Sequence, residues 1–248
     1  ILGIGIASIG PVDIRNGIIL NPPRFYGVKH VPIKETIQKK YNLPVYFDHD
    51  NNCAALAEKL FGIGKAEQDF LLLAVSNGIG SGFVCGGEVF HSHRGFETEL
   101  GHVSINCKGL QCSCGNRGCL EQYASATGIV RVAKRVMAAT DEESVLRGFS
   151  RLSAKNVLDA YKEGDKLAAK VMDEVGEKLG SALAVFACVV DPEAIVIGGG
   201  VSRAGQPLID CIETYYKKYA FSACKETPII LAKLGNDAGI YGSARMVI

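Results

Sequence analysis

One histidine and three cysteines in the middle of the chain have the spacing of a metal site. His102 is followed by Cys112, Cys114 and Cys119, in the pattern His-x9-Cys-x-Cys-x4-Cys. Three thiolates and one imidazole complete a tetrahedral shell around Zn²⁺ and leave no position open for a substrate. The glycines between the ligands allow the tight turns that such a loop needs. The spacing predicts a structural zinc loop over residues 102–119, with Cys107 as an alternative ligand that spacing alone does not exclude.

A disulfide framework explains the cysteines less well than a metal does. The chain has nine cysteines among 248 residues, and four of them lie within residues 107–119, between Gly, Asn and Lys residues that are unusual in a core. No charged and then apolar leader opens the sequence. We therefore expect a cytoplasmic protein, in a compartment where clustered thiols bind metal.

A second group of polar residues suits the binding of hydroxyl groups. Asp50 lies where a predicted strand meets a predicted helix, and its carboxylate could accept a proton from a sugar hydroxyl as a general base. The alternative is that Asp50, Asn51 and Asn52 only cap the helix. Glu99 precedes His102 by three residues and Glu121 follows the last zinc ligand by two, so the zinc loop would draw both carboxylates toward one volume.

These residues need an α/β scaffold to position them. Short apolar runs predict strands, and patterns with helical spacing alternate with them, which is typical of sheets covered by helices. The predicted strands are Gly3–Ala7, Val45–Phe47, Phe70–Val75, Ala194–Gly198 and Pro228–Ala232. The predicted helices are Asn52–Phe61, Leu120–Ala139, Ala154–Tyr161 and Asp165–Val190. Gly176 and Gly180 inside the last helix predict close packing against another backbone.

Glycine-rich stretches at residues 78–82, 86–87 and 198–200 interrupt this pattern. The last one directly follows a predicted strand, where backbone N–H groups can approach a phosphate. A tight turn without any ligand is the alternative for each of them.

Residues 99–102 and 112–125 resemble the signature of the ROK family, named for repressors, open reading frames and kinases. The likeness extends through residues 3–13, 50–58, 197–202 and 234–242, and so covers essentially the whole chain. It implies the two-lobed α/β fold of actin-like ATPases (ribonuclease H-like), with sugar bound between the lobes. Residues 1–50 and 236–248 are expected to be the remainder of an N-terminal lobe whose first part is missing, and residues 51–235 the C-terminal lobe.

The resemblance also implies roles for single residues. Asp50 matches the catalytic base of the family kinases. The expected sugar-binding residues are Gly10, His49, Asp50, Glu99, His102 and Glu121. The expected nucleotide-binding residues, where nucleotide is used, are Asn77, Gly78, Gly80, Gly198, Gly199 and Gly200. By the same likeness His102 uses one ring nitrogen on zinc and the other on a sugar hydroxyl.

The chain departs from the kinase pattern in three places. Family kinases carry an Asp-x-Gly-Gly-Thr phosphate loop upstream, which these residues do not include. The second phosphate loop, usually Gly-Thr-Gly-Ile-Gly, reads Ser76-Asn77-Gly78-Ile79-Gly80. His49 replaces the Asn that normally precedes the base, and a His-Asp pair is similar to some repressor members of the family.

Two functions follow from this likeness. The first is the sugar-binding effector domain of a ROK transcriptional regulator, with its DNA-binding domain outside these residues. The second is an N-terminally truncated ROK sugar kinase, which transfers the ATP γ-phosphate to a hexose or an N-acetylhexosamine with Asp50 as base. A fold that has neither activity is a third, plainer alternative.

Charge and hydropathy limit the partners. The net charge is +1, from 27 basic and 26 acidic residues without a dense basic cluster, so we expect no nucleic acid on this chain itself. The apolar runs are too short to cross a membrane. The expected cofactors are structural Zn²⁺ and, only in a kinase, ATP with Mg²⁺. The expected partners are a small sugar and, by resemblance, a second copy in a homodimer, with residues 189–201 as a candidate interface.

Overall fold

The computed structural model describes residues 1–20, 29–93 and 98–248. These residues form two compact units. Unit 1 consists of residues 1–72, 81–99 and 232–248, and unit 2 of residues 73–80 and 100–231. The expected division into lobes of residues 1–50 with 236–248 and of residues 51–235 stays a prediction.

Unit 1 contains a parallel pair of strands that leads to Asp50. Strand β1 (Ile4–Ser8) pairs with β4 (Val45–His49), and Ser8 lies opposite His49 in the register. Helix α1 (Ile33–Tyr41) precedes β4 and ends at Asn42, which adopts the left-handed conformation. A short antiparallel pair joins β2 (Val12–Asp13) to β3 (Ile18–Ile19).

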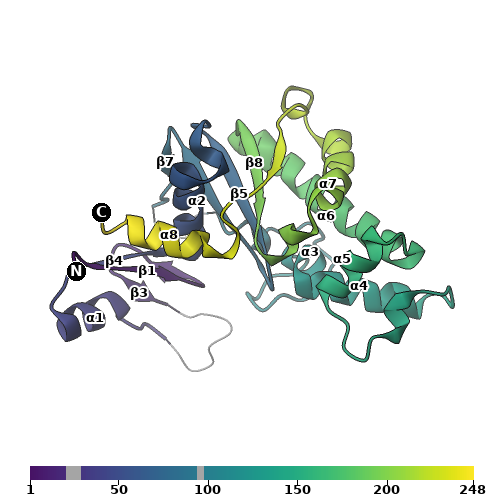
Figure 1. Ribbon diagram of the computed structural model, residues 1–248, viewed down its shortest axis with the longest axis horizontal. Coiled ribbons are helices and arrows are strands. Elements are labelled where there is room, and N and C mark those ends of the chain that lie inside the picture. Colours follow the sequence, from purple (N-terminus) through teal and green to yellow (C-terminus); the bar gives the residue numbers. More distant parts are fainter. Residues whose placement is uncertain (21–28, 94–97) are drawn as a thin grey trace. The chain divides into compact units, whose positions relative to one another are not determined.

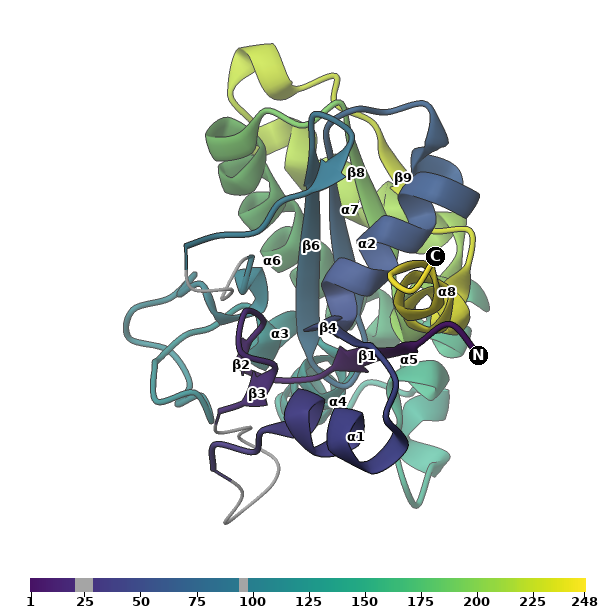
Figure 2. The ribbon, with the colours of Figure 1, turned by 90° about the vertical axis from the view of Figure 1, so that its left-hand side faces the viewer.

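Helix α2 (Asp50–Phe61) follows β4 directly and packs on the C-terminal helix α8 (Ala238–Arg245). Figure 2 shows the two helices side by side. A Cβ at Gly242 would lie 1.8 Å from the backbone oxygen of Cys53, so only glycine allows this approach. The close crossing holds the start of α2, and with it Asp50, against the C-terminal helix.

The main sheet has five strands in the order β7-β6-β5-β8-β9. Their bounds are Glu88–Val89 for β7, Ile79–Cys85 for β6, Phe70–Val75 for β5, Ala194–Gly198 for β8 and Ile229–Leu231 for β9. Strand β6 pairs antiparallel with β7, and β8 pairs parallel with β9. Strand β8 is buried along its whole length, as its unbroken apolar run predicts.

Unit 2 is built around the 25-residue helix α6 (Lys166–Val190), which packs on α7 (Gln206–Tyr219). Both are green in Figure 1 and lie next to each other. A Cβ at Gly176 would lie 2.3 Å from Cys211 Sγ, and one at Gly180 would lie 2.6 Å from the backbone of Ile212 and Tyr216. The predicted role of both glycines in close helix packing is confirmed.

Further helices complete unit 2. They are α3 (Glu121–Ala124), α4 (Ala126–Ala138) and α5 (Ala154–Lys162). Short 3-10 turns lie at Ile63–Lys65 in unit 1, at Leu100–His102, Val145–Gly148, Gly200–Ala204 and Ser222–Cys224 in unit 2, and at Gly235–Asp237 in unit 1.

One predicted helix is wrong in its extent. Residues 120–139 form two helices, because Ser125 adopts extended backbone angles and its hydroxyl accepts the N–H of Gly128 as the cap of α4. Among the residues that the structure describes, no helix has the length and apolar character needed to cross a membrane.

Candidate functional site

The four predicted metal ligands come together in unit 2. The ligand atoms of His102, Cys112, Cys114 and Cys119 all lie within 4.8 Å of one another. His102 Nδ1 lies 3.6 Å from Cys112 Sγ, and the sulfurs of Cys114 and Cys119 lie 3.7 Å apart. Cys107, the alternative ligand, is exposed and lies outside this group.

These distances fit a metal at the centre of the group. A tetrahedron with metal–sulfur bonds of about 2.3 Å and metal–nitrogen bonds of about 2.0–2.1 Å has S–S edges of about 3.8 Å and S–N edges of about 3.5–3.6 Å. The Gln122 amide donates to Cys112 Sγ at 3.4 Å, as an outer partner that supports a thiolate ligand. The cluster can therefore hold a tetrahedral metal ion.

Tight turns give the metal loop its shape. Gly115 and Gly118 have φ angles of +94° and +72°, and a Cβ at Gly118 would lie 1.7 Å from the backbone oxygen of Asn106. Only glycine adopts both the angle and the contact without strain. The predicted need for glycines between the ligands is confirmed.

In unit 1, three of the expected sugar-binding side chains lie together. His49 Nδ1 is 3.3 Å from Asp50 Oδ1, and His49 Nε2 is 3.8 Å from Glu99 Oε1. The His49 side chain is 12% exposed, whereas those of Asp50 and Glu99 are 37% and 36% exposed. The imidazole thus lies between two carboxylates that remain open to solvent.

Burial raises the pKa of the Asp50 carboxyl above its ordinary value, although His49 and the backbone N–H groups at the start of α2 act in the opposite direction. Asp50 Oδ1 accepts the Asn51 side-chain amide at 2.8 Å. The Asp50 side chain is 37% exposed, so its carboxylate can accept a hydroxyl group.

The cap of α2 differs from the sequence prediction. Neither Asp50 nor the two asparagines cap the helix, because Asp50 is already its first residue. His49 is the N-cap, and its Nδ1 accepts the N–H of Asn51 at 3.4 Å. This bond places the proton of the neutral ring on Nε2, which faces Glu99.

Sequence reasoning missed a second pair that lies beside this cluster in unit 1. Asp48 is buried, and its Oδ2 lies 2.9 Å from His91 Nε2. Its Oδ1 accepts the N–H of His49 at 2.6 Å and the amide of Asn52 at 2.9 Å. The alternation of side chains along β4 could have placed Asp48 and His49 on opposite faces, but His91, 43 residues away, carried no signal.

The expected sugar-binding residues are divided between the two units. Gly10, His49, Asp50 and Glu99 belong to unit 1, and His102 and Glu121 to unit 2. Gly10 has a φ of +81°, an angle that favours glycine. Glu121 begins α3, and its Oε2 accepts the N–H of Ile79 at 3.1 Å.

The expected nucleotide residues lie on two glycine-rich turns of unit 2. Gly198 ends β8, and Gly199 has a φ of +80°. A Cβ at Gly199 would lie 2.5 Å from the backbone oxygen of Val75. The hydroxyl of Ser76 accepts the N–H of Gly200 at 3.2 Å. The turns at residues 76–80 and 198–200 are thereby joined. Gly78 lies in the first turn, and Gly80 lies within β6.

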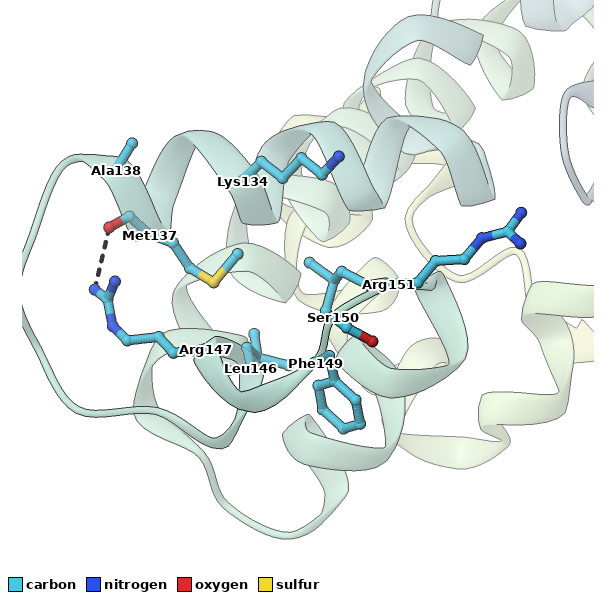
Figure 3. A pocket seen from close by; sticks show the side chains of 9 residues that line it. Lys134, Met137, Ala138, Leu146, Arg147, Phe149, Ser150 and Arg151 are labelled. Carbon is cyan, nitrogen blue, oxygen red and sulfur yellow. Dashed lines mark hydrogen bonds between the residues drawn. The ribbon is translucent and has the colours of Figure 1, made fainter.

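A cavity of about 610 Å³ also lies in unit 2. Figure 3 shows its lining by α4 and the segment after it, including Lys134, Met137 and Phe149. The guanidinium of Arg147 donates to the carbonyl oxygen of Met137 at 3.1 Å, so it ties the walls of this cavity together. None of the predicted site residues lines it.

Comparison with known proteins identifies the family. The profile of the ROK family matches residues 1–248. The chain belongs to the ROK family. Glucokinase of Halalkalibacterium halodurans is 35% identical over 252 residues, which cover 100% of this chain and 76% of that protein.

Two solved structures represent both branches of the ROK family. A ROK family glucokinase from Streptomyces griseus, in complex with glucose and AMPPNP, has a TM-score of 0.90 at 31% identity, and the match covers 98% of this chain and 80% of that one. A ROK family transcriptional regulator, a homologue of the E. coli MLC protein, has a TM-score of 0.85 at 33% identity, over 95% of this chain and 59% of that one. The expected actin-like ATPase fold is confirmed. The ROK relatives are sugar kinases and regulators, and this chain is similar to both.

Proposed function

We propose that this chain is the sugar-binding effector domain of a ROK-family transcriptional regulator, and that His49, Asp50 and Glu99 bind the sugar. The observation that carries the proposal is the position of His49 between the two carboxylates. Sugar hydroxyls both donate and accept, and a site that recognises them needs groups of both kinds. Asp50 Oδ2 and Glu99 supply acceptors, while His49 Nε2–H supplies a donor.

The regulator is favoured over the kinase because of residue 49. Family kinases have an Asn at this position, and here an imidazole lies 3.3 Å from Asp50 Oδ1. The His49 imidazole acts against the rise in the pKa of Asp50 that burial causes, and so weakens that carboxylate as a base. A sensor needs this pair only to hold a hydroxyl group.

The second candidate is a sugar kinase, and a different observation supports it. Burial raises the pKa of Asp50, which makes its carboxylate a stronger base than an ordinary aspartate. In that case Asp50 Oδ2 would take the proton of the sugar hydroxyl as the hydroxyl oxygen attacks the γ-phosphorus of ATP and ADP leaves. The likeness to glucokinases supports this candidate too.

We propose Zn²⁺ as the ion of the four-ligand cluster. Three thiolates and an imidazole are a donor set that zinc prefers, and four protein ligands complete its shell. The ion would fix the loop over residues 102–119 and the orientation of the His102 ring. The homodimer, the cytoplasmic location and the lack of nucleic acid on this chain remain proposals.

The sugar site is tested by calorimetric titration of Glu99→Gln and of a matched control, Glu88→Gln, an exposed glutamate of the same unit. Loss of a hydrogen bond to a charged acceptor is expected to weaken sugar binding by roughly 10- to 100-fold in the first variant, and the control should match the wild type. Equal affinity in both variants would remove Glu99 from the site.

His49→Asn separates the two candidates, since it restores the residue of the kinases. A regulator domain is expected to bind sugar with altered affinity and to show no ATP turnover in either form. Turnover in the wild type that His49→Asn preserves or increases would favour the kinase.

A further inference from the structure

At the two turns where the family places nucleotide, two backbone N–H groups already have partners within this chain. Phosphate groups are bound at glycine-rich turns by free backbone N–H groups. Here the N–H of Gly200 donates to Ser76 Oγ at 3.2 Å, and the N–H of Ile79 donates to Glu121 Oε2 at 3.1 Å. Two donors that could meet a phosphate oxygen are therefore engaged by the protein itself.

Further hydrogen bonds fix the shape of the first turn. The N–H of Ser76 donates to the Gly78 oxygen at 2.8 Å, and the Ser76 oxygen accepts the N–H of Ala126 at 2.8 Å. The Asn77 oxygen accepts the hydroxyl of Thr127 at 3.0 Å. These bonds hold the turn in one shape against the start of α4.

Of these contacts, the one made by residue 76 distinguishes this chain from the kinase pattern. Glu121 belongs to the signature that the whole family shares, whereas Ser76 stands where the kinase pattern has glycine. The Ser76 hydroxyl on the N–H of Gly200 is therefore the contact that does not fit the nucleotide that the family implies.

We propose that Ser76 is a specificity-determining residue that keeps nucleotide phosphate off the N–H of Gly200. The kinase pattern has glycine at this position, which leaves that donor free. The Ser76 hydroxyl accepts the N–H of Gly200 and also fills the space beside Gly199. A Cβ at Gly199 would lie 2.8 Å from Ser76 Oγ. The inference deepens the proposed function, because a sensor of sugar has no use for a phosphate donor.

The test is calorimetric titration of MgADP and MgATP into the whole wild-type chain and into three variants. Ser76→Gly frees the Gly200 donor and removes the side chain, and Ser76→Ala frees the donor but keeps Cβ. Ser202→Ala is the matched control, because it removes a hydroxyl that contacts Gly199 on the same turn and leaves Gly200 untouched.

We expect Ser76→Gly to bind both nucleotides at least about tenfold more tightly than the wild type and Ser202→Ala, which should not approach saturation over the same concentration range. The affinity of Ser76→Ala should lie between them. Wild-type binding as tight as that of Ser76→Gly would overturn the proposal, as would a folded Ser76→Gly that binds no better than the wild type. If Ser76→Gly fails to fold, the rank of Ser76→Ala above wild type decides. Sugar titration of the same samples reports the proposed function separately, so either can fail alone.

Discussion

Replacement of Cys114 by serine tests the metal loop most sharply, because the chain offers a matched control. Cys114 and Cys107 are both exposed cysteines of the same loop, but only Cys114 belongs to the four-ligand group. Cys114→Ser therefore removes a candidate ligand with little loss of packing, and Cys107→Ser removes another exposed thiol that lies outside the cluster.

The expected loss of stability follows from the number of ligands. Structural zinc sites contribute about 10–16 kcal/mol in total, and an equal share for four ligands is roughly 2.5–4 kcal/mol each. For a chain of this length 1 kcal/mol shifts Tm by about 2–4 °C, so we expect Cys114→Ser to lower Tm by roughly 5–16 °C. Its zinc content should fall well below one equivalent per chain.

Metal analysis and thermal melts of the two variants and the wild type provide the measurement. Cys107→Ser should keep about one equivalent of zinc and the wild-type Tm. The reasoning is refuted if well-folded wild-type protein holds far less than one equivalent, or if Cys114→Ser leaves both zinc content and Tm unchanged.

Four further predictions concern the sugar site, its neighbour Asp48 and the helix packing. Asp50→Asn should raise Tm at neutral pH, because a raised pKa means that the ionised carboxyl destabilises the fold. The stabilisation by the protonated carboxyl is fully present below the unfolded-state pKa and is lost as pH rises through the folded-state pKa. Asp48→Asn should lower Tm and reduce the free energy of unfolding by about 1.5–3 kcal/mol, because it weakens hydrogen bonds from three donors to a buried carboxylate. Thermal melts of both variants show whether the two changes in Tm have opposite signs. Sugar affinity measured against pH should fall on acidification in a range above that of an ordinary aspartate, and a flat profile would exclude ionised Asp50 as a ligand. Gly180→Ala should destabilise by about 1–3 kcal/mol in denaturant titration because its Cβ meets backbone at 2.6 Å, while Gly148→Ala, with no atom within 4 Å, should not.

Elements with a single strong signal could be predicted from the sequence. Strands β5 and β8 have the same bounds as their predicted apolar runs, because an apolar run of that length bounded by turn residues is typical of a buried strand. The cluster of four possible metal ligands was also predictable, since a spacing within 18 residues limits which side chains can meet. Gly176 and Gly180 predicted close packing of α6 against another backbone, and the partner in the structure is α7.

Elements with mixed signals were missed. Strand β6 begins Ile79-Gly-Ser-Gly, and the glycines favoured a turn, although these residues form a strand whose other end pairs with β7. Helix α7 has buried residues at positions 208, 209, 212 and 216, a helical spacing that could have been recognised after Pro207.

The residues of the candidate site could be proposed from the sequence, but the hydrogen bonds among them could not. The identity of Asp50 and Glu99 as candidates came from likeness and residue type. The N-cap role of His49 and the pairing of Asp48 with His91 depend on contacts between distant segments, which local propensity does not encode.

The most direct test of the central claim is calorimetric titration of the wild-type protein with glucose, mannose, N-acetylglucosamine and N-acetylmannosamine, with and without MgATP, while ADP formation is followed. The account predicts that at least one sugar binds saturably, that MgATP leaves its affinity unchanged, and that no ADP forms. Sugar-dependent ADP formation that Asp50→Asn abolishes would contradict it and establish a kinase, and the absence of binding by any sugar would remove the sugar site.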